Sequence, residues 1–206
     1  RCLNLLETPT KGTITFNGTE ITDPKAKIDQ IRQQMGMVFQ HFNLFPNMTI
    51  RKNITLAPVR TKLLTQAEAD DTATTLLRRV GLEDKADSYP AQLSGGMLQR
   101  AAAALLMALH PKYILADEPT SALDAENRTL LLELLEKQRE TAGILFISHD
   151  VAALRALCGT VYVIEHGMLT EQGTMQELLE HPKQAWTKEY AAANRPVSRE
   201  GWTWTD

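Results

Sequence analysis

Cysteine is scarce in this 206-residue sequence, which contains only Cys2 and Cys158. Two solitary cysteines without metal-type spacing exclude a disulfide framework and a thiolate metal site, and are typical of the reduced thiols of a cytosolic protein. Long apolar runs are lacking too, since the longest uncharged one, residues 101–109, is roughly half of what a membrane span needs. Basic residues are not in excess, because the formal net charge is −3. This balance argues against a nucleic-acid-binding surface as the main function.

The segment Ser94-Gly95-Gly96 opens a helical run at residues 97–109. Ser94 is a good N-cap, and the two glycines let backbone N–H groups approach a ligand because no Cβ is in the way. The unpaired N–H groups and the positive dipole end of the helix favour an anion at this place. Taken alone, such a segment is more often simply a capped helix after a turn.

A short apolar run, residues 113–116, is followed directly by the carboxylates Asp117 and Glu118. The run lies between Pro111 and Pro119 and has the character of a buried parallel strand. An Asp at the end of such a strand is well placed to hold Mg²⁺, and the following Glu to orient an attacking water molecule. An isolated acidic pair is more often a helix cap, but the two segments together favour phosphate chemistry.

Five motifs in this order and with these gaps make the chain resemble the ATPase subunits of ABC transporters over essentially its whole length. They are the Q-loop at residues 37–40 (MVFQ), the signature at 93–96 (LSGG) followed by Gln99 and Arg100, Walker B at 114–119 (ILADEP), the D-loop at 121–124 (SALD) and the switch histidine within 146–150 (FISHD).

The resemblance implies an α/β fold of the P-loop NTPase-like (ABC ATPase) class, with a mostly parallel sheet flanked by helices. One ATPase domain is expected over residues 1–206, with an inserted helical subdomain at 46–100 and a remnant of an antiparallel β-subdomain near the start. Residues 196–206 are expected to form a flexible tail, since they are Pro-, Ser- and Trp-containing without a period.

The resemblance also implies the cofactors ATP and Mg²⁺ and a set of roles. Asp117 and Gln40 would serve Mg²⁺, Gln40 would also reach the attacking water, Glu118 would polarise that water, and His149 would contact the γ-phosphate. Ser94, Gly95 and Gly96 would reach across to the nucleotide of a partner subunit, and Asp124 would link the two sites.

The partners implied are a second ATPase subunit, identical or different, and transmembrane permease subunits. A protein of this type is peripheral to the membrane, at its cytoplasmic face, and binds no nucleic acid as its main function. The apolar residues Phe42, Leu44 and Phe45 follow the Q-loop motif, and the surface around them is expected to accept a short helix from the permease.

The phosphate-binding pattern G-x-x-x-x-G-K-[ST] occurs nowhere in the sequence, which begins at Arg1 without a methionine. In the resembling family a helix like residues 1–6 directly follows that loop. We therefore expect an N-terminally truncated ABC ATPase that is inactive by itself, and a GKS or GKT encoded shortly before Arg1 would restore the enzyme. A nucleotide-independent regulatory or binding protein derived from this fold is the alternative that the missing loop favours.

Three positions depart from the pattern of the family. Met97 and Leu98 stand where Gln is common, and Leu105 stands where Arg is usual. Residues 97–100 resemble oligopeptide and nickel importers, whereas residues 31–96 resemble importers of polar amino acids. The expected function is therefore to power an importer of polar amino acids, with an oligopeptide- or nickel-type importer as the alternative.

Hydrophobic periodicity and turn residues predict the remaining elements. Helices are expected at residues 1–6, 23–34, 48–58, 65–80, 97–109, 125–140, 151–157 and 174–179, with 174–179 as the last helix, and residues 186–190 resemble the closing segment of the family. Strands are expected at 13–17, 20–21, 36–39, 113–116, 144–147 (buried), 161–164 and 168–171, with hairpins through Asn17-Gly18 and His166-Gly167.

Overall fold

The computed structural model describes residues 2–38, 44–121 and 123–194. The chain divides into two compact units between Ser148 and His149, and each unit is described by itself. No helix in the described part of the chain has both the length and the apolar character that crossing a membrane requires.

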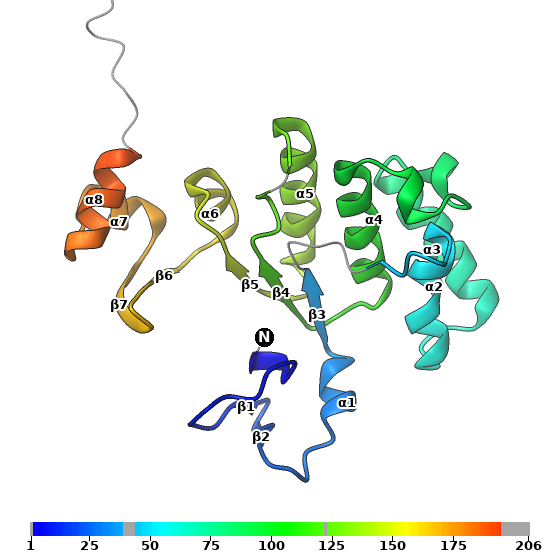
Figure 1. Cartoon of the computed structure of the whole chain (residues 1–206), viewed down its shortest axis with the longest axis horizontal. Helices are drawn as coiled ribbons and strands as arrows, with labels where there is room; N and C mark the ends of the chain where they lie inside the picture. Colours follow the sequence, from blue (N-terminus) through cyan, green and yellow to red (C-terminus); the bar gives the residue numbers. More distant parts are fainter. Residues whose placement is uncertain (1, 39–43, 122, 195–206) are drawn as a thin grey trace, which may run out of the picture. The chain divides into compact units, whose positions relative to one another are not determined.

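A three-stranded parallel sheet forms the centre of the first unit. Its order is β3 (Met35–Val38), β4 (Tyr113–Asp117) and β5 (Gly143–Ile147), as Figure 1 shows. The strand predicted at residues 113–116 is confirmed as β4, which lies in the middle of the sheet. Functional groups of open α/β sheets gather beyond the carboxyl ends of the strands, so Asp117 and the residues after it lie where a ligand site is expected.

The prediction that residues 144–147 are buried is wrong for one face of β5. Phe146 is buried, but Leu145 and Ile147 are 43% and 54% exposed. Successive side chains of a strand point to opposite faces, and in this strand only the face that carries Phe146 is covered.

Two long helices stand beside the sheet, α4 (Gly95–Ala108) and α5 (Ala125–Gln138). A glycine on β3 lets α4 approach closely, because a Cβ on Gly36 would collide with Leu106 Cδ1. The helix α5 buries three leucines on its inward face, namely Leu131, Leu134 and Leu135, whereas the fourth predicted member, Leu130, is only half-buried.

Two further helices pack against each other and against α4: α2 (Ile50–Arg60) and α3 (Gln66–Arg79). The predicted capping box at the start of α3 is confirmed, since Glu68 Oε2 accepts from Thr65 N at 2.8 Å and Thr65 Oγ1 accepts from Glu68 N. Gly81 ends α3 with φ of +65°.

The predicted end of α2 at Pro58 is wrong by two residues. A proline in the last turn of a helix removes only one hydrogen bond, and the turn closes through the bond from Lys62 N to the Val59 carbonyl. The grouping of residues 46–100 as a subdomain stays a prediction.

Short elements complete the first unit. A hairpin of β1 (Thr15–Phe16) and β2 (Thr19–Glu20) turns at Asn17 and Gly18, both with positive φ, as predicted. Two 3₁₀ turns, η2 (Glu83–Lys85) and η3 (Pro90–Gln92), lead to the signature segment.

Two helices predicted near the start of the chain are much shorter than expected. The first is only the 3₁₀ turn η1 (Cys2–Asn4), which Leu5 ends with φ of +51°, and the second is α1 (Ile28–Arg32). Asp23 and Pro24 form a turn in place of the first part of the second helix, because the Asp23 carboxylate accepts from Lys25 N at 2.8 Å.

The second unit contains α6 (Val151–Leu157), the antiparallel hairpin β6 (Val161–Glu165) and β7 (Met168–Gly173), and the helices α7 (Met175–Glu180) and α8 (Ala185–Ala193). His166 and Gly167 have positive φ and form the predicted turn. The prediction that 174–179 is the last helix is wrong, because α8 follows it. The nine residues of α8, AWTKEYAAA, are too few to show a clear helical period. The predicted tail at 196–206 lies outside the described residues.

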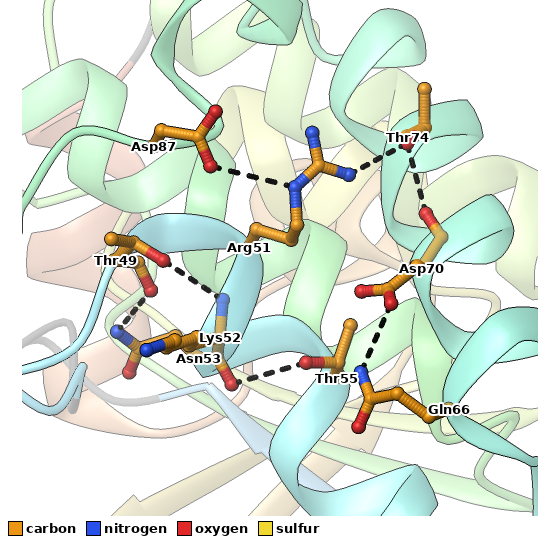
Figure 2. A network of polar contacts seen from close by, with 9 residues as sticks. All are labelled: Thr49, Arg51, Lys52, Asn53, Thr55, Gln66, Asp70, Thr74 and Asp87. Atoms are coloured by element: carbon orange, nitrogen blue, oxygen red, sulfur yellow. Dashed lines mark hydrogen bonds and ion pairs between the residues drawn. The ribbon is translucent and has the colours of Figure 1, made fainter.

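The buried side chain of Asn53 holds the chain segment that precedes α2. Asn53 is 1% exposed, and its Oδ1 accepts from Phe45 N at 2.7 Å. Its Nδ2 lies within 3.2 Å of three carbonyl oxygens, those of Phe45, Met48 and Thr49. Figure 2 shows Asn53 beside Thr49, and Arg51 of the same helix reaching Thr74 of α3. The amide thus satisfies Phe45 N and Met48 O, and it adds to the bonds that Phe45 O and Thr49 O accept from Met48 N and Asn53 N.

We predict that Asn53→Ala lowers the free energy of unfolding by roughly 2 kcal/mol, because the Phe45 N–H and the Met48 carbonyl lose their partner and a buried side chain is removed. Urea denaturation measures this change. Lys52→Ala is the matched control, since the Lys52 side chain is exposed on the same helix and only its backbone N–H bonds to Thr49. Equal stability of the two variants would contradict the role given to Asn53.

Candidate functional site

The two predicted carboxylates lie at the carboxyl end of the central strand. Asp117 is the last residue of β4, and Glu118 follows it with φ of +46°. Both residues are half-buried. The Glu118 N–H donates to the Ile147 carbonyl at 2.9 Å, so the backbone of Glu118 is fixed to the neighbouring strand β5. A left-handed conformation is uncommon for a residue with a Cβ, and strained residues of this kind concentrate at functional sites.

The chain then turns sharply towards α5. The Glu118 carbonyl accepts from Ser121 N at 3.3 Å and from Ser121 Oγ at 3.0 Å. Asp124 ends this segment as the N-cap of α5, where its carboxylate accepts from Asn127 N at 2.8 Å. The predicted D-loop is therefore a short bridge between the carboxylates and the start of a helix.

The predicted glycine pair begins α4. Ser94 is the N-cap, and its Oγ accepts from Met97 N at 3.4 Å. Gly95 is exposed and Gly96 half-buried. The first N–H groups of the helix therefore lie at an exposed end, which is suited to an anion.

Asn127 brings the starts of α4 and α5 together. A Cβ on Gly96 would lie 2.6 Å from Asn127 Nδ2 and 2.7 Å from Asn127 Cγ, so no larger residue fits without displacement. The same amide donates to both carboxylate oxygens of Asp124 at 2.9 Å. The signature glycine and the D-loop aspartate are thus linked through one side chain.

The charge state of Asp124 follows from these contacts. Hydrogen bonds from the Asn127 backbone N–H, then from the Asn127 side chain, and the nearby charge of Arg100 hold the pKa of Asp124 below its ordinary value of 3.8. Asp124 is therefore ionised at neutral pH, next to the positive ends of two helices.

A second contact ties α4 to the segment after the carboxylates. The buried Gln99 amide donates to the Pro119 carbonyl. Arg100 donates to the Val80 carbonyl at 2.9 Å. The three residues that depart from the resembling family, Met97, Leu98 and Leu105, are all half-buried, and Gln99 supplies a polar link that does not depend on them.

His149 and Gln40 complete the predicted set. His149 is the first residue of the second unit and is exposed. The next residue, Asp150, caps α6 by accepting from Ala152 N at 3.0 Å and Ala153 N at 3.2 Å. Gln40 lies outside the described residues.

Sequence reasoning missed Asn127. The only sequence signal was its place three residues after a capping aspartate, where a polar side chain can reach back to the cap. Its approach to Gly96 connects two helices that the sequence does not place side by side. Gln99 was noted as part of the signature, but not for its contact with Pro119.

The donor set suits Mg²⁺ held jointly with a nucleotide. No group of three or more His, Cys, Asp or Glu that could hold a metal was found among the residues that the structure describes. Mg²⁺ needs no such cage, because it is usually bound by one or two carboxylates together with substrate phosphates and water. Asp117 fits that pattern as a single carboxylate ligand.

The parallel sheet, the carboxylates after its central strand and the capped glycine helix define an α/β protein of the P-loop NTPase-like class. The chain belongs to the ABC transporter family, whose model, described as "ABC transporter", matches residues 1–121. Binding of nucleotide is general to this family.

Known proteins share both the sequence and the fold. The chain is 43% identical over 184 residues to the arginine transport ATP-binding protein ArtM of Bacillus subtilis, covering 89% of this chain and 77% of that protein. It is 45% identical over 186 residues to the methionine import ATP-binding protein MetN of Sodalis glossinidius. That alignment covers 89% of this chain but only 54% of that protein. The fold matches the ATP-binding cassette MJ0796, solved as a dimer in a post-hydrolysis state bound to ADP and Pi, with a TM-score of 0.75 and 29% identity over 84% of this chain and 78% of that one.

We predict that Gly96→Ala lowers the free energy of unfolding by about 1–3 kcal/mol, because the new methyl group collides with an amide held in place by Asp124. Adding Asn127→Ala removes the colliding group, so the double variant should be less destabilised than the sum of the two single changes. Gly159→Ala is the control, since an added Cβ there meets nothing within 4 Å. Urea denaturation of the four variants measures these changes in the free energy of unfolding. A double variant destabilised by the sum of the two single changes would contradict the role given to the contact.

Proposed function

We propose that this protein is the ATP-binding and ATP-hydrolysing subunit of an ABC importer of polar amino acids. The observation that carries the proposal is the strained Glu118 directly after Asp117, at the carboxyl end of the central parallel strand. The names of the relatives, one an arginine transporter and one a methionine importer, support amino acids as the substrate class. The narrower assignment to polar amino acids rests on residues 31–96, which resemble importers of such amino acids.

Four residues act on the nucleotide of the protein's own subunit in this proposal. Asp117 and Gln40 hold Mg²⁺, which when bound stabilises the negative charge of the phosphoryl group that is transferred. Glu118 polarises the attacking water as a general base, and His149 contacts the γ-phosphate. The fixed backbone of Glu118 supports this role, because a base must be held in place before the substrate arrives.

The start of α4 acts on the nucleotide of the partner subunit. Ser94, Gly95 and Gly96 offer the N-terminal N–H groups of a helix to its phosphates, and Asp124 links the two sites. The exposure of Gly95 supports this arrangement, as does the dimeric state of the matching cassette with ADP and Pi. Closing and opening of such a dimer supplies the two states that drive a transporter.

The partners proposed are a second ATPase subunit and the transmembrane permease subunits. The protein would then lie at the cytoplasmic face of the cell membrane, where the permease holds it. No nucleic acid is among its proposed partners. Met97 and Leu98 favour an oligopeptide- or nickel-type importer as the second candidate. The lack of a P-loop pattern within these 206 residues favours the third, a regulatory derivative that acts without nucleotide.

We predict that Glu118→Gln lowers kcat for ATP hydrolysis by at least about 100-fold while nucleotide binding is retained, because the amide cannot act as a base. The measurement uses the full-length protein assembled with its permease. Glu126→Gln is the matched control, as Glu126 is an exposed carboxylate in the first turn of α5. An active Glu118→Gln protein would overturn the proposed chemistry, and a protein without any nucleotide affinity would favour the regulatory alternative.

A further prediction concerns the 206-residue chain by itself, which carries Ser94–Gly96 but no P-loop pattern. We expect it to hydrolyse no ATP, yet to associate with a complete ABC subunit when ATP is present, because one shared site would combine the partner's P-loop with the start of α4. Analytical ultracentrifugation with and without ATP measures the association, after circular dichroism has established that the chain is folded.

Two variants sharpen that association experiment. Ser94→Arg should abolish the effect of ATP by placing a long side chain at the exposed helix end, whereas Glu133→Arg, exposed on α5, should leave it intact. Association that ignores ATP or survives Ser94→Arg would refute a shared site.

A further inference from the structure

The backbone of His149 is held from two sides within the second unit. On one side, the Asp150 carboxylate caps α6, and this cap fixes the peptide bond between His149 and Asp150. On the other side, the hydroxyl of Tyr190 donates to the His149 carbonyl at 2.7 Å. The two residues lie 41 positions apart in the sequence, so within the second unit this bond joins the start of α6 to α8.

The ring of Tyr190 has a fixed orientation. It stacks on Trp186, one turn earlier in α8, with centroids 4.9 Å apart and an interplanar angle of 15°. On the neighbouring face of the helix, Thr187 and Ala191 are each 1% exposed, and α8 packs against α7. Stacking and burial therefore restrict the tyrosine before its hydroxyl reaches His149, which reduces the entropy lost in forming the bond.

The helix α8 is in turn anchored to the hairpin by a buried carboxylate. Glu171 of β7 accepts from Lys183 N at 3.0 Å and from Gln184 N at 3.2 Å, directly before α8 begins. Burial acts to raise the pKa of Glu171, but the nearby Thr187 hydroxyl and the hydrogen bonds from these two N–H groups outweigh it and lower the pKa below its ordinary value. Glu171 is thus ionised at neutral pH and fixes the position of α8.

We infer that Tyr190 is a positioning residue for His149, holding the backbone from which the histidine side chain projects towards its phosphate. This inference rests on the role given to His149 in the proposed function. The Tyr190 hydroxyl holds His149, since it donates the hydrogen bond to the His149 carbonyl, whereas the Tyr190 ring only orients the hydroxyl. A displacement of His149 would accordingly be transmitted to α8, and a displacement of α8 to His149.

The test uses Tyr190→Phe, which keeps the stack on Trp186 and removes only the hydroxyl. In the full-length protein assembled with its permease, we expect kcat for ATP hydrolysis to fall about three- to tenfold, which corresponds to the free energy of one lost hydrogen bond. KM for ATP should stay unchanged, because the bond orients a catalytic group and does not bind substrate. Tyr162→Phe is the matched control, as it removes a hydroxyl from an exposed tyrosine of β6.

A double-mutant cycle separates positioning from general damage. If Tyr190 acts through His149, then Tyr190→Phe should have no further effect in a His149→Ala background. An equal loss in both backgrounds, or no loss in either, overturns the inference. A His149→Ala protein with full activity overturns instead the proposed role of His149.

A second readout does not depend on catalysis. The protein contains five histidines, and NMR of their labelled imidazole rings reports on each one. Tyr190→Phe should shift and broaden the His149 signal and leave the other four in place, whereas Tyr162→Phe should leave all five unchanged. An unmoved His149 signal overturns the tether, whatever the activity shows.

Discussion

The structure of the candidate site depends on one constraint, which is that α4 and α5 begin side by side. Gly96 is the second residue of α4 and Asn127 the third of α5, and they touch closely enough to exclude a Cβ. Two helix N-termini each carry roughly half a positive charge, so their approach is unfavourable unless an anion lies between them. Asp124 supplies one such anion, and its lowered pKa is the expected consequence. The exposed start of α4 at Ser94 and Gly95 remains open to another anion.

The fold could be predicted where local rules decide it. The capping box of Thr65 and Glu68, the turn at His166-Gly167 and the apolar run of β4 depend on neighbouring residues only, and the structure has them as predicted. Predictions were wrong where a local competitor intervened. Asp23 uses its carboxylate to form a turn where a longer helix was expected, and α8 is stabilised by Glu171 and by packing on α7, neither of which its own nine residues reveal.

The candidate site was predictable as a list of residues and not as an arrangement. Asp117, Glu118 and Ser94 stand out because strand ends and helix starts dictate what chemistry they can present. Asn127, Gln99 and Tyr190 gave little signal, since each acts on a different element, 20 residues away for Gln99 and 41 for Tyr190. Such contacts follow from how helices pack, and a single sequence does not specify the packing.

Glu118 differs from the other residues with positive φ in the described part of the chain. Asn17 and His166 occupy hairpin turns, and Leu5, Lys62 and His110 follow helical turns, places where the left-handed conformation is common. Glu118 instead follows a strand of the parallel sheet, where glycine would avoid a strain of about 1–2 kcal/mol. The bonds of its N–H to Ile147 and of its carbonyl to Ser121 maintain the conformation. A strain that is maintained on both sides is best explained by the side chain itself, since glycine would meet every backbone requirement at this position and would lack only the carboxylate.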